Sequence, residues 1–289
     1  MATQGLAKLE QQLTAAPSIK AMFQIETVQE RFISNYEAVT GKKDGVNRFS
    51  SEVFAYLDII SEKPDIANCD RFQHFKAIIR SATTGLSFRD NKLYIIPGPN
   101  KTIKIQSSPA GKREMLEMME DILQVPEPQL VMKGDKFQHD KMNNRVVEHI
   151  ATEKSAVETT MDNILAAYVR IVYKDGRIID TVVYHPDLVK ARAKTKTRSE
   201  DTPWNVWTGE MCKKVATNRA FRLYHKYPDN VVTFGTDDDK HETEADTTDV
   251  EHTVQPQQQN EVMPLEQPAQ AAEPTKSQAT TAADDYLKG

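Results

Sequence analysis

Positively charged side chains are concentrated between residues 190 and 226. This stretch carries ten basic residues against three acidic ones, a net charge of +7. The basic residues are Lys190, Arg192, Lys194, Lys196, Arg198, Lys213, Lys214, Arg219, Arg222 and Lys226. Cationic side chains in such number can neutralise a run of phosphates, the interaction that dominates sequence-independent binding of nucleic acid. The cluster therefore favours a nucleic-acid partner over an ordinary solvated basic face.

Two tryptophans, Trp204 and Trp207, lie between the two halves of this basic cluster. Aromatic rings on single-strand-binding surfaces stack on bases, so we take Trp204 as a candidate base contact. The alternative for either ring is a place in the core or at a subunit contact, which is the more common role of tryptophan. On the last expected helix, Lys214, Arg222 and Lys226 recur at multiples of four residues and therefore share one face.

Sequence motifs for nucleotide-driven or covalent chemistry are missing. Gly111-Lys112 is followed by Arg113 rather than Ser or Thr, so there is no Walker loop, and no Gly-x-Gly-x-x-Gly turn occurs. The seven histidines show no metal-binding spacing, and neither cysteine has a sequence cue for activation. A metal-dependent nuclease stays open, because five carboxylates flank expected strands and could converge. They are Asp135, Asp140, Glu148, Glu158 and Asp180.

The formal net charge of −5 is distributed unevenly. Residues 236–289 hold 13 acidic and 3 basic residues, a net of −10, whereas residues 1–235 hold 34 basic and 29 acidic residues, a net of +5. The last segment has no Trp, Phe or Ile, so it cannot bury enough apolar surface to fold. We therefore expect one folded domain at 1–235 and a disordered acidic tail at 236–289. Such a tail solubilises the chain, docks partners or competes for a basic groove.

The sequence indicates neither a membrane span nor a secretion signal. It has no run of about 18 apolar residues, and its first residues lack a basic segment followed by an apolar one. Cys69 and Cys212 are too few and too far apart for a disulfide scaffold or a cysteine zinc site. These features favour a reducing, cytoplasmic compartment.

The apolar periodicity predicts helices first, then mainly strands, then helices again. Helices are expected at 4–13, at 18–36, from Ser50 or Ser51 to just before Pro64, from Asp70 to Gly85, at 111–123, after His185-Pro186, and at 209–226. Strands are expected at 92–97, 101–106, 129–133, 136–140, 145–150, 165–173 and 178–184. Asp175-Gly176 predicts a tight primed turn in the last hairpin. This order predicts an α+β fold in which helices flank an antiparallel sheet of hairpins.

Five segments form an ordered set of longer motifs. They are residues 68–86, 93–97, 131–137, 167–176 and 203–228, the last containing Pro203-Trp204, Glu210-Met-Cys-Lys-Lys214 and Tyr224-His-Lys-Tyr-Pro228. In order and spacing they resemble the RecT/Redβ family of phage single-strand annealing proteins, over about residues 17–230. Two departures exist: residues 106–111 replace the usual glycine–aromatic pair, and Arg219 and Arg222 are not adjacent as in the family. The register of the last helix therefore stays open.

The resemblance implies a protein that coats single-stranded DNA and anneals complementary strands in recombination, within a ring or helical oligomer. It implies no ATP, leaves a role for magnesium open, and suggests a partner exonuclease and a host single-strand-binding protein in a bacterial cell carrying a phage or prophage. Lys213, Lys214, Arg219 and Arg222 would contact phosphates from the last helix. Lys92, Lys101, Lys112 and Arg113 would do so from the opposite wall of the groove. Besides the nuclease, a scaffold protein that binds strands without annealing them is a further alternative.

Overall fold

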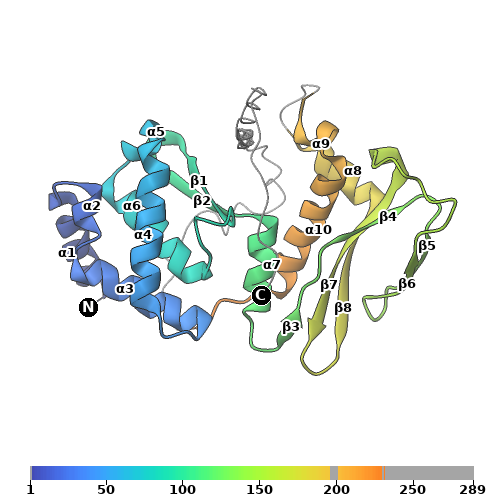
Figure 1. Cartoon of the computed structure of the whole chain (residues 1–289), viewed down its shortest axis with the longest axis horizontal. Helices are drawn as coiled ribbons and strands as arrows, with labels where there is room; N and C mark the ends of the chain where they lie inside the picture. The colour runs from blue at the N-terminus through green and yellow to red at the C-terminus, as the bar shows by residue number, and fades with distance from the viewer. Residues whose placement is uncertain (1, 196–200, 230, 232–289) are drawn as a thin grey trace, which may run out of the picture. The chain divides into compact units, whose positions relative to one another are not determined.

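The structure, a computed structural model, describes residues 2–195, 201–229 and 231 (Figure 1). The expected acidic tail at 236–289 and the expected domain boundary at 235 lie outside these residues. Helices and antiparallel strands share the described part, which confirms the predicted α+β class. No helix of the described part is long and apolar enough to cross a membrane.

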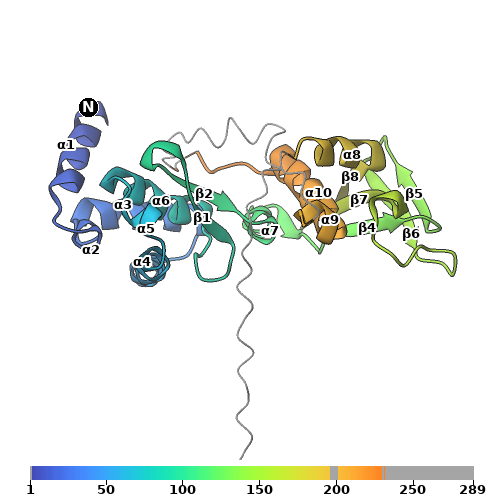
Figure 2. The ribbon, with the colours of Figure 1, turned by 90° about the horizontal axis from the view of Figure 1, so that it is seen from above.

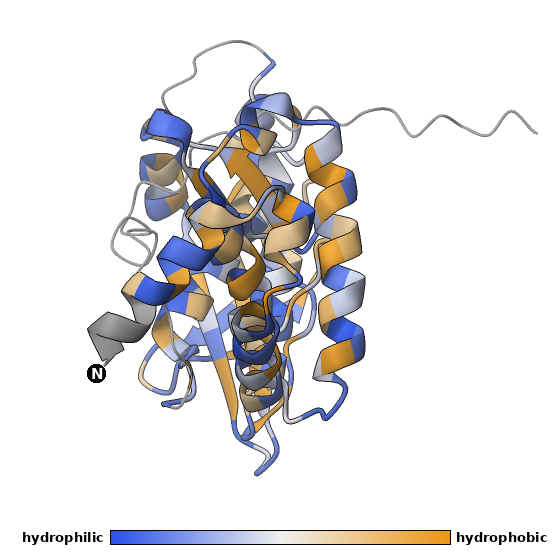
Figure 3. Ribbon diagram, turned by 90° about the vertical axis from the view of Figure 1, so that its left-hand side faces the viewer, coloured by the Kyte–Doolittle hydropathy of each residue, from blue (hydrophilic) through white to orange (hydrophobic). Residues whose placement is uncertain are grey.

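The first part of the fold, residues 2–107, is mainly helical. Its elements are α1 (Ala2–Ala15), α2 (Ile19–Met22), α3 (Glu26–Thr40), α4 (Gly45–Ser61), α5 (Pro64–Ala67), α6 (Arg71–Thr84), β1 (Leu93–Pro97), η1 (Pro99–Lys101) and β2 (Ile103–Ser107). Helix α6 packs against α3, α1 and β2, and the core around it contains the fully buried rings of Phe32, Tyr56 and Phe75. Figure 3 shows hydrophobic and hydrophilic positions alternating along these helices, as amphipathic helices require.

A buried carboxylate on α4 fixes the segment that leads from α6 into β1. Glu52 accepts hydrogen bonds from Ser87 Oγ at 2.7 Å and from the Phe88 backbone N–H at 2.9 Å. Arg48 Nε lies 3.3 Å from the same carboxylate. Because a buried charge is costly unless it is paired and hydrogen-bonded, these donors explain why Glu52 is tolerated in the core.

The second part, residues 108–229, is built around an antiparallel sheet. Its elements are α7 (Pro109–Glu117), β3 (Ile122–Gln124), β4 (Gln129–Met132), β5 (Lys136–Asp140), β6 (Arg145–Ile150), η2 (Met161–Asn163), β7 (Ile164–Tyr173), β8 (Ile178–Tyr184), α8 (His185–Ala193), α9 (Pro203–Val206) and α10 (Thr208–Tyr224). Strand β7 is central: it pairs with β8 along one edge, and with β3 and β4 along the other. In this register Ala167 lies opposite both Leu130 and Val183.

The two faces of β7 pack against different elements. Val169 and Ile171 face a core that also contains Trp204, Cys212 and Ala216 of α9 and α10. The opposite face is covered by β5 and β6, which form a separate two-stranded sheet. The alternation along β7 therefore places α10 and the β5–β6 hairpin on opposite faces of the sheet.

Polar side chains add to the apolar packing that holds the β5–β6 hairpin on the sheet. Asp180 on β8 is buried, binds Arg170 through two contacts of 2.8 Å, and accepts the Val146 N–H at 2.7 Å. His139 Nδ1 lies 2.8 Å from the Tyr184 hydroxyl, and His149 Nδ1 lies 3.1 Å from the Tyr168 hydroxyl. The backbone N–H of Asp180 also donates a hydrogen bond to the Asn144 carbonyl at 2.7 Å.

Most predicted elements are confirmed, with four corrections. The helix assigned to Ser50 or Ser51 begins earlier, at Gly45, and the expected helix at 18–36 is broken at 23–25 into α2 and α3. The helix expected at 111–123 ends at Glu117, whose carboxylate accepts the Val125 N–H at 2.8 Å, while β3 pairs with β7. The β7–β8 turn is not a primed turn, since Gly176 has positive φ and Asp175 does not.

Candidate nucleic-acid interface

Helix α10 carries the second half of the basic cluster and packs against β7 of the sheet. Met211, Cys212, Ala216 and Ala220 are buried and belong to the core shared with β7. The start of the helix is held by Thr208, whose hydroxyl donates to the Trp204 carbonyl at 2.8 Å. With the small and apolar side chains directed to the sheet, the basic side chains are left on the outer surface.

The basic side chains of α10 are held by weak surface contacts. Lys213 Nζ lies 2.8 Å from Glu210, and Arg219 Nη1 lies 3.1 Å from Asp187 on α8. Arg222 is exposed, and Lys214 is half-buried. Ion pairs between exposed side chains contribute little to stability, so a phosphate can displace Glu210 or Asp187 at small cost.

Helix α8 brings further cations beside α10. The Asp187 carboxylate lies near a cation from each helix: Lys190 Nζ of α8 is 3.8 Å from it, and Arg219 of α10 binds it. Arg192 Nη2 donates to Asn205 Oδ1 at 2.6 Å, and Lys194 is exposed at the end of the helix. Lys190 of the first half of the predicted cluster therefore lies beside Arg219 of the second half. We call the described basic side chains of the two helices the α8–α10 surface: Lys190, Arg192, Lys194, Lys213, Lys214, Arg219 and Arg222. The predicted contacts Lys196 and Arg198 lie outside the described residues.

Lys112 does not lie on an open groove wall. Its side chain on α7 is buried, its ammonium donates to Asn218 Oδ1 on α10 at 3.0 Å, and it lies 5.6 Å from the centre of the Phe221 ring. Only 3% of the residue is exposed. The prediction that Lys112 contacts phosphate therefore needs correction: in this structure it joins α7 to α10.

The other basic residues predicted for the opposite wall of the groove, Lys92, Lys101 and Arg113, lie in different environments. Lys92 Nζ pairs with Glu114 at 2.5 Å, and Lys101 is exposed on the turn between β1 and β2. Arg113 points elsewhere, donating to the Val125 carbonyl at 3.4 Å and pairing with Glu127. Lys92 and Lys101 thus remain candidates, whereas Arg113 is committed to the connection between β3 and β4.

The two tryptophans have opposite environments. Trp204 is 1% exposed and lies in the core beneath α10, so its prediction as a base contact is wrong for this structure. Trp207 is 63% exposed at the junction of α9 and α10. Trp207 is therefore the ring that can stack on a base.

Three cations outside the predicted set, Lys104, Lys76 and Arg80, belong to β2 and α6 and are not part of the α8–α10 surface. Lys104 is exposed on β2, Lys76 Nζ lies 5.0 Å from the Phe72 ring centre, and Arg80 lies 5.7 Å from that of Tyr227. Their signal is weak, because they are single cations separated by several residues. Lys104 could have been found from strand alternation, since it occupies an outward position of the predicted hairpin.

His225 and Cys212 supply neither a positive charge nor a thiolate to this surface near neutral pH. Burial lowers the pKa of His225 to about 4, helped by the nearby Arg80, so this side chain is neutral at physiological pH. Its ring stacks on Phe221 with centres 4.3 Å apart. Burial raises the pKa of Cys212 to about 12, which keeps it a protonated thiol. His225 therefore adds no positive charge beside the end of α10 near neutral pH.

Three of the five carboxylates considered for a nuclease have separate partners. Asp180 pairs with Arg170, Asp135 lies 3.0 Å from His149 Nε2, and Glu148 pairs with Lys136 at 2.7 Å. Within the described ranges no group of three or more His, Cys, Asp or Glu side chains has the arrangement to hold a metal ion.

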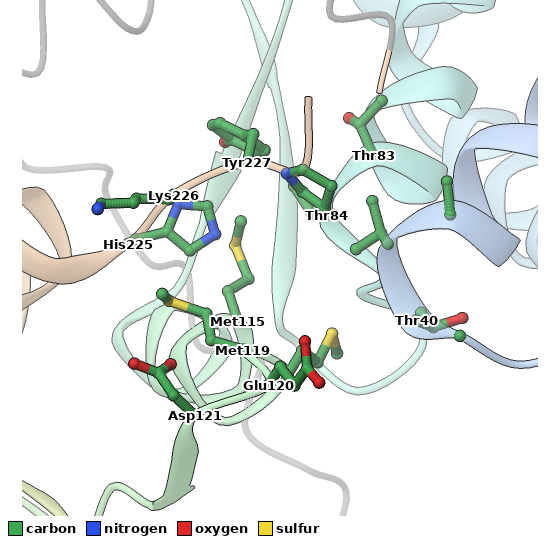
Figure 4. A pocket seen from close by; sticks show the side chains of 15 residues that line it. Thr40, Thr83, Thr84, Met115, Met119, Glu120, Asp121, His225, Lys226 and Tyr227 are labelled. Atoms are coloured by element: carbon green, nitrogen blue, oxygen red, sulfur yellow. The ribbon is translucent and has the colours of Figure 1, made fainter. Parts of the chain in front are cut away.

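A cavity of about 660 Å³ lies where the ends of α3, α6 and α7 meet residues 225–228 (Figure 4). Its lining includes Met115, Met119, Glu120, Asp121 and Tyr227. Lys226, the last residue of the basic cluster, and His225 also line this cavity, opposite the Glu120 and Asp121 carboxylates.

Comparison with known proteins identifies a family for the chain. A sequence model of the RecT family matches residues 48–252, which is well over half of the chain and includes every residue of the α8–α10 surface. No curated protein sequence matches the chain closely enough to be counted as a relative.

Proposed function

The chain belongs to the RecT family, whose proteins bind single-stranded DNA and anneal it in recombination, and on this premise we propose how it does so. We propose that it works without hydrolysing ATP, that the α8–α10 surface binds one DNA backbone, and that the working form is a ring or helical oligomer. The observation that carries the proposal is that Lys190 of α8 and Arg219 of α10 lie beside each other at Asp187.

Annealing requires the repulsion between two phosphate backbones to be reduced. A surface that neutralises one backbone releases counterions and leaves the base edges free to test a complementary strand. Sequence is then read by base pairing and not by side chains. We therefore expect binding with little sequence preference and a strong dependence on salt.

The exposed ring of Trp207 adds a stacking platform beside the cations. Base–aromatic stacking tolerates any base and stabilises single strands by about 1–3 kcal/mol per base. Together with the backbone contacts, it would hold bases in an extended array.

Complementary oligonucleotides mixed with protein, in the absence of nucleotide, test this proposal. Accelerated duplex formation without ATP supports it, and a requirement for ATP hydrolysis contradicts it. The same reaction with magnesium and then with EDTA measures any contribution of the ion to annealing. Loss of labelled DNA only when metal is present would favour the nuclease alternative, and binding without faster pairing would favour a scaffold.

The partners and location follow the same reasoning and are also proposals. An annealing protein needs single strands, so we propose that an exonuclease supplies them and that a host single-strand-binding protein occupies them first. We place this activity in the cytoplasm of a bacterial cell, with a phage or prophage origin.

A further inference from the structure

The cavity beside residues 225–228 has a lining that suits an aromatic side chain. Its apolar residues come from α3, α7 and the residues that follow α7 and α10: Val39, Met115, Met118, Met119 and Pro228. In Figure 4, Met115 and Met119 lie across the cavity from Tyr227. The volume of about 660 Å³ is within the range of about 300–1,000 Å³ for pockets that enclose a small ligand. Methionine side chains adapt to an inserted group and make favourable contacts with aromatic rings.

The charged residues of this lining lie at its outer edge. Glu120, Asp121 and Lys226 are all exposed, whereas Met115 is buried and Met119 is half-buried. An apolar group that packs on the methionines would therefore leave the three charges in water, where they need no partner.

The segment after α10 is held at this cavity by aromatic contacts. Figure 2 shows it running from α10 toward the helical part of the fold. Tyr227 packs on the core of the helical part, and Arg80 of α6 lies 5.7 Å from the centre of its ring. The ring centre of His225 lies 4.6 Å from that of Tyr227. The chain therefore continues from a fixed point beside the cavity.

A turn follows at once. The Val231 N–H donates to the Pro228 carbonyl at 3.1 Å, which is the hydrogen bond between the first and last residues of a β-turn. Such a turn brings the Cα atoms of these two residues within about 7 Å of each other. Phe234 is three residues beyond Val231, and three residues span at most about 11 Å. Phe234 can therefore reach the cavity that Pro228 lines.

The residues after the turn are the best available occupant of the cavity. Val231-Val-Thr-Phe234 is apolar, and Phe234 is the last phenylalanine of the chain, since residues 236–289 contain no Trp, Phe or Ile. The RecT family match continues to residue 252, so it includes this segment. A group tethered so closely has an effective concentration in the millimolar range, which favours it over a separate partner.

We propose that Phe234 docks into this cavity of its own chain, against Met115, Met118 and Met119. The docked ring would close the apolar lining. It would also make the acidic segment 236–289 start beside Lys226, which lines the same cavity.

Thermal unfolding of the full-length chain gives the first test. Phe234→Ala should lower Tm by about 3–12 °C, because a ring buried in the cavity is lost. Phe234→Leu keeps an apolar side chain and should lose less. Tyr286→Ala removes an aromatic ring from the acidic segment and should leave Tm unchanged. A Tm of Phe234→Ala equal to that of the natural chain would overturn the proposal.

A double-mutant cycle tests the contact itself. Met119→Ala removes one side chain of the cavity and lowers Tm by its own amount. In the double variant with Phe234→Ala, the decrease should be at least about 2 °C smaller than the sum of the two single decreases, because both changes remove the same contact. Additive decreases would contradict docking against Met119.

A photo-reactive phenylalanine analogue at position 234 identifies the neighbours directly. Mixing heavy-isotope and light chains separates links within one chain from links between copies. Links within one chain to Met115, Met118 or Met119 support the docking. Links to the cavity of another copy, links to DNA, or the absence of links to these methionines would overturn it. Neither readout involves annealing, so the result is independent of the proposed function.

Discussion

Replacing Lys112 by Ala tests whether this side chain supports the fold or contacts DNA. The structure shows its ammonium donating to Asn218 at 3.0 Å and lying 5.6 Å from the Phe221 ring centre, with 3% of the residue exposed. Truncation removes about three buried methylene groups, worth about 2 kcal/mol, and a charged hydrogen bond worth about 1.5 kcal/mol. Relief of the buried ammonium offsets part of this loss. We expect a net destabilisation of about 3 kcal/mol.

The assay pairs thermal unfolding with DNA titrations at several salt concentrations. For a chain of this size, about 3 kcal/mol corresponds to a decrease in Tm of about 6–12 °C. The slope of log affinity against log salt should stay unchanged for Lys112→Ala, because no phosphate contact is lost. Arg222→Ala is the matched control: Arg222 is exposed, so its Tm should stay within about 2 °C while the slope falls by about 0.7.

The reverse pattern would refute this reasoning. If Lys112→Ala kept its Tm but lost salt slope, the ammonium would contact phosphate in solution, and the α7–α10 bond would not be its main role. If Arg222→Ala changed neither quantity, the DNA would lie away from the outer side of α10.

Three further perturbations follow from the structure and one from the sequence. Asp187→Asn removes the acceptor that now holds Arg219, so single-stranded DNA should bind a few-fold more tightly in filter or anisotropy titrations; weaker binding would show that Asp187 orders the site. His225 has a folded pKa of about 4 against 6.5 when unfolded, so its protonation favours the unfolded chain, and stability should fall by about 3 kcal/mol as the pH is lowered from about 7.5 to 4. His225→Phe should remove this pH-dependent loss of stability, which denaturant titrations at each pH measure. An unchanged pH profile would contradict the assignment. Trp207→Phe should abolish fluorescence quenching by single-stranded DNA, whereas persistent quenching would implicate the buried ring instead. A chain ending at Gly235 loses a net charge of −10 and should anneal as before and bind single strands at least as tightly, and its failure to fold or anneal would show that the tail is structural.

The elements with strong local patterns could be predicted from the sequence. The β7–β8 hairpin follows from two apolar runs around Asp175-Gly176, and α6 follows from Asp70 before its first residue and Gly85 after its last. Gly85 has φ of 69°, the left-handed conformation that glycine adopts without strain. These signals lie within a few residues of each other, so no tertiary information is needed to interpret them.

The candidate site was harder to predict because burial depends on distant partners. Lys112 follows Gly111 in an exposed-looking polar stretch, and only the packing of α10, more than 100 residues later, covers it. Trp204 and Trp207 have similar sequence surroundings, yet the turn between α9 and α10 buries one and exposes the other. Asp187 was not predicted at all, because its role depends on Arg219 of another helix.

The attachment of the β5–β6 hairpin has a consequence for hydrogen exchange. The hairpin forms its own two-stranded ladder and is joined to the sheet by the Asp180 contacts and by two histidine–tyrosine pairs. Releasing these bonds and the packing of Phe137 and Val146 on the sheet would free the hairpin while β7 keeps its partners β3, β4 and β8. Local opening of such a unit requires less free energy than global unfolding. Amide protons of β5 and β6 should therefore exchange with solvent sooner than those of β7, as a separate cooperative unit within one folded chain.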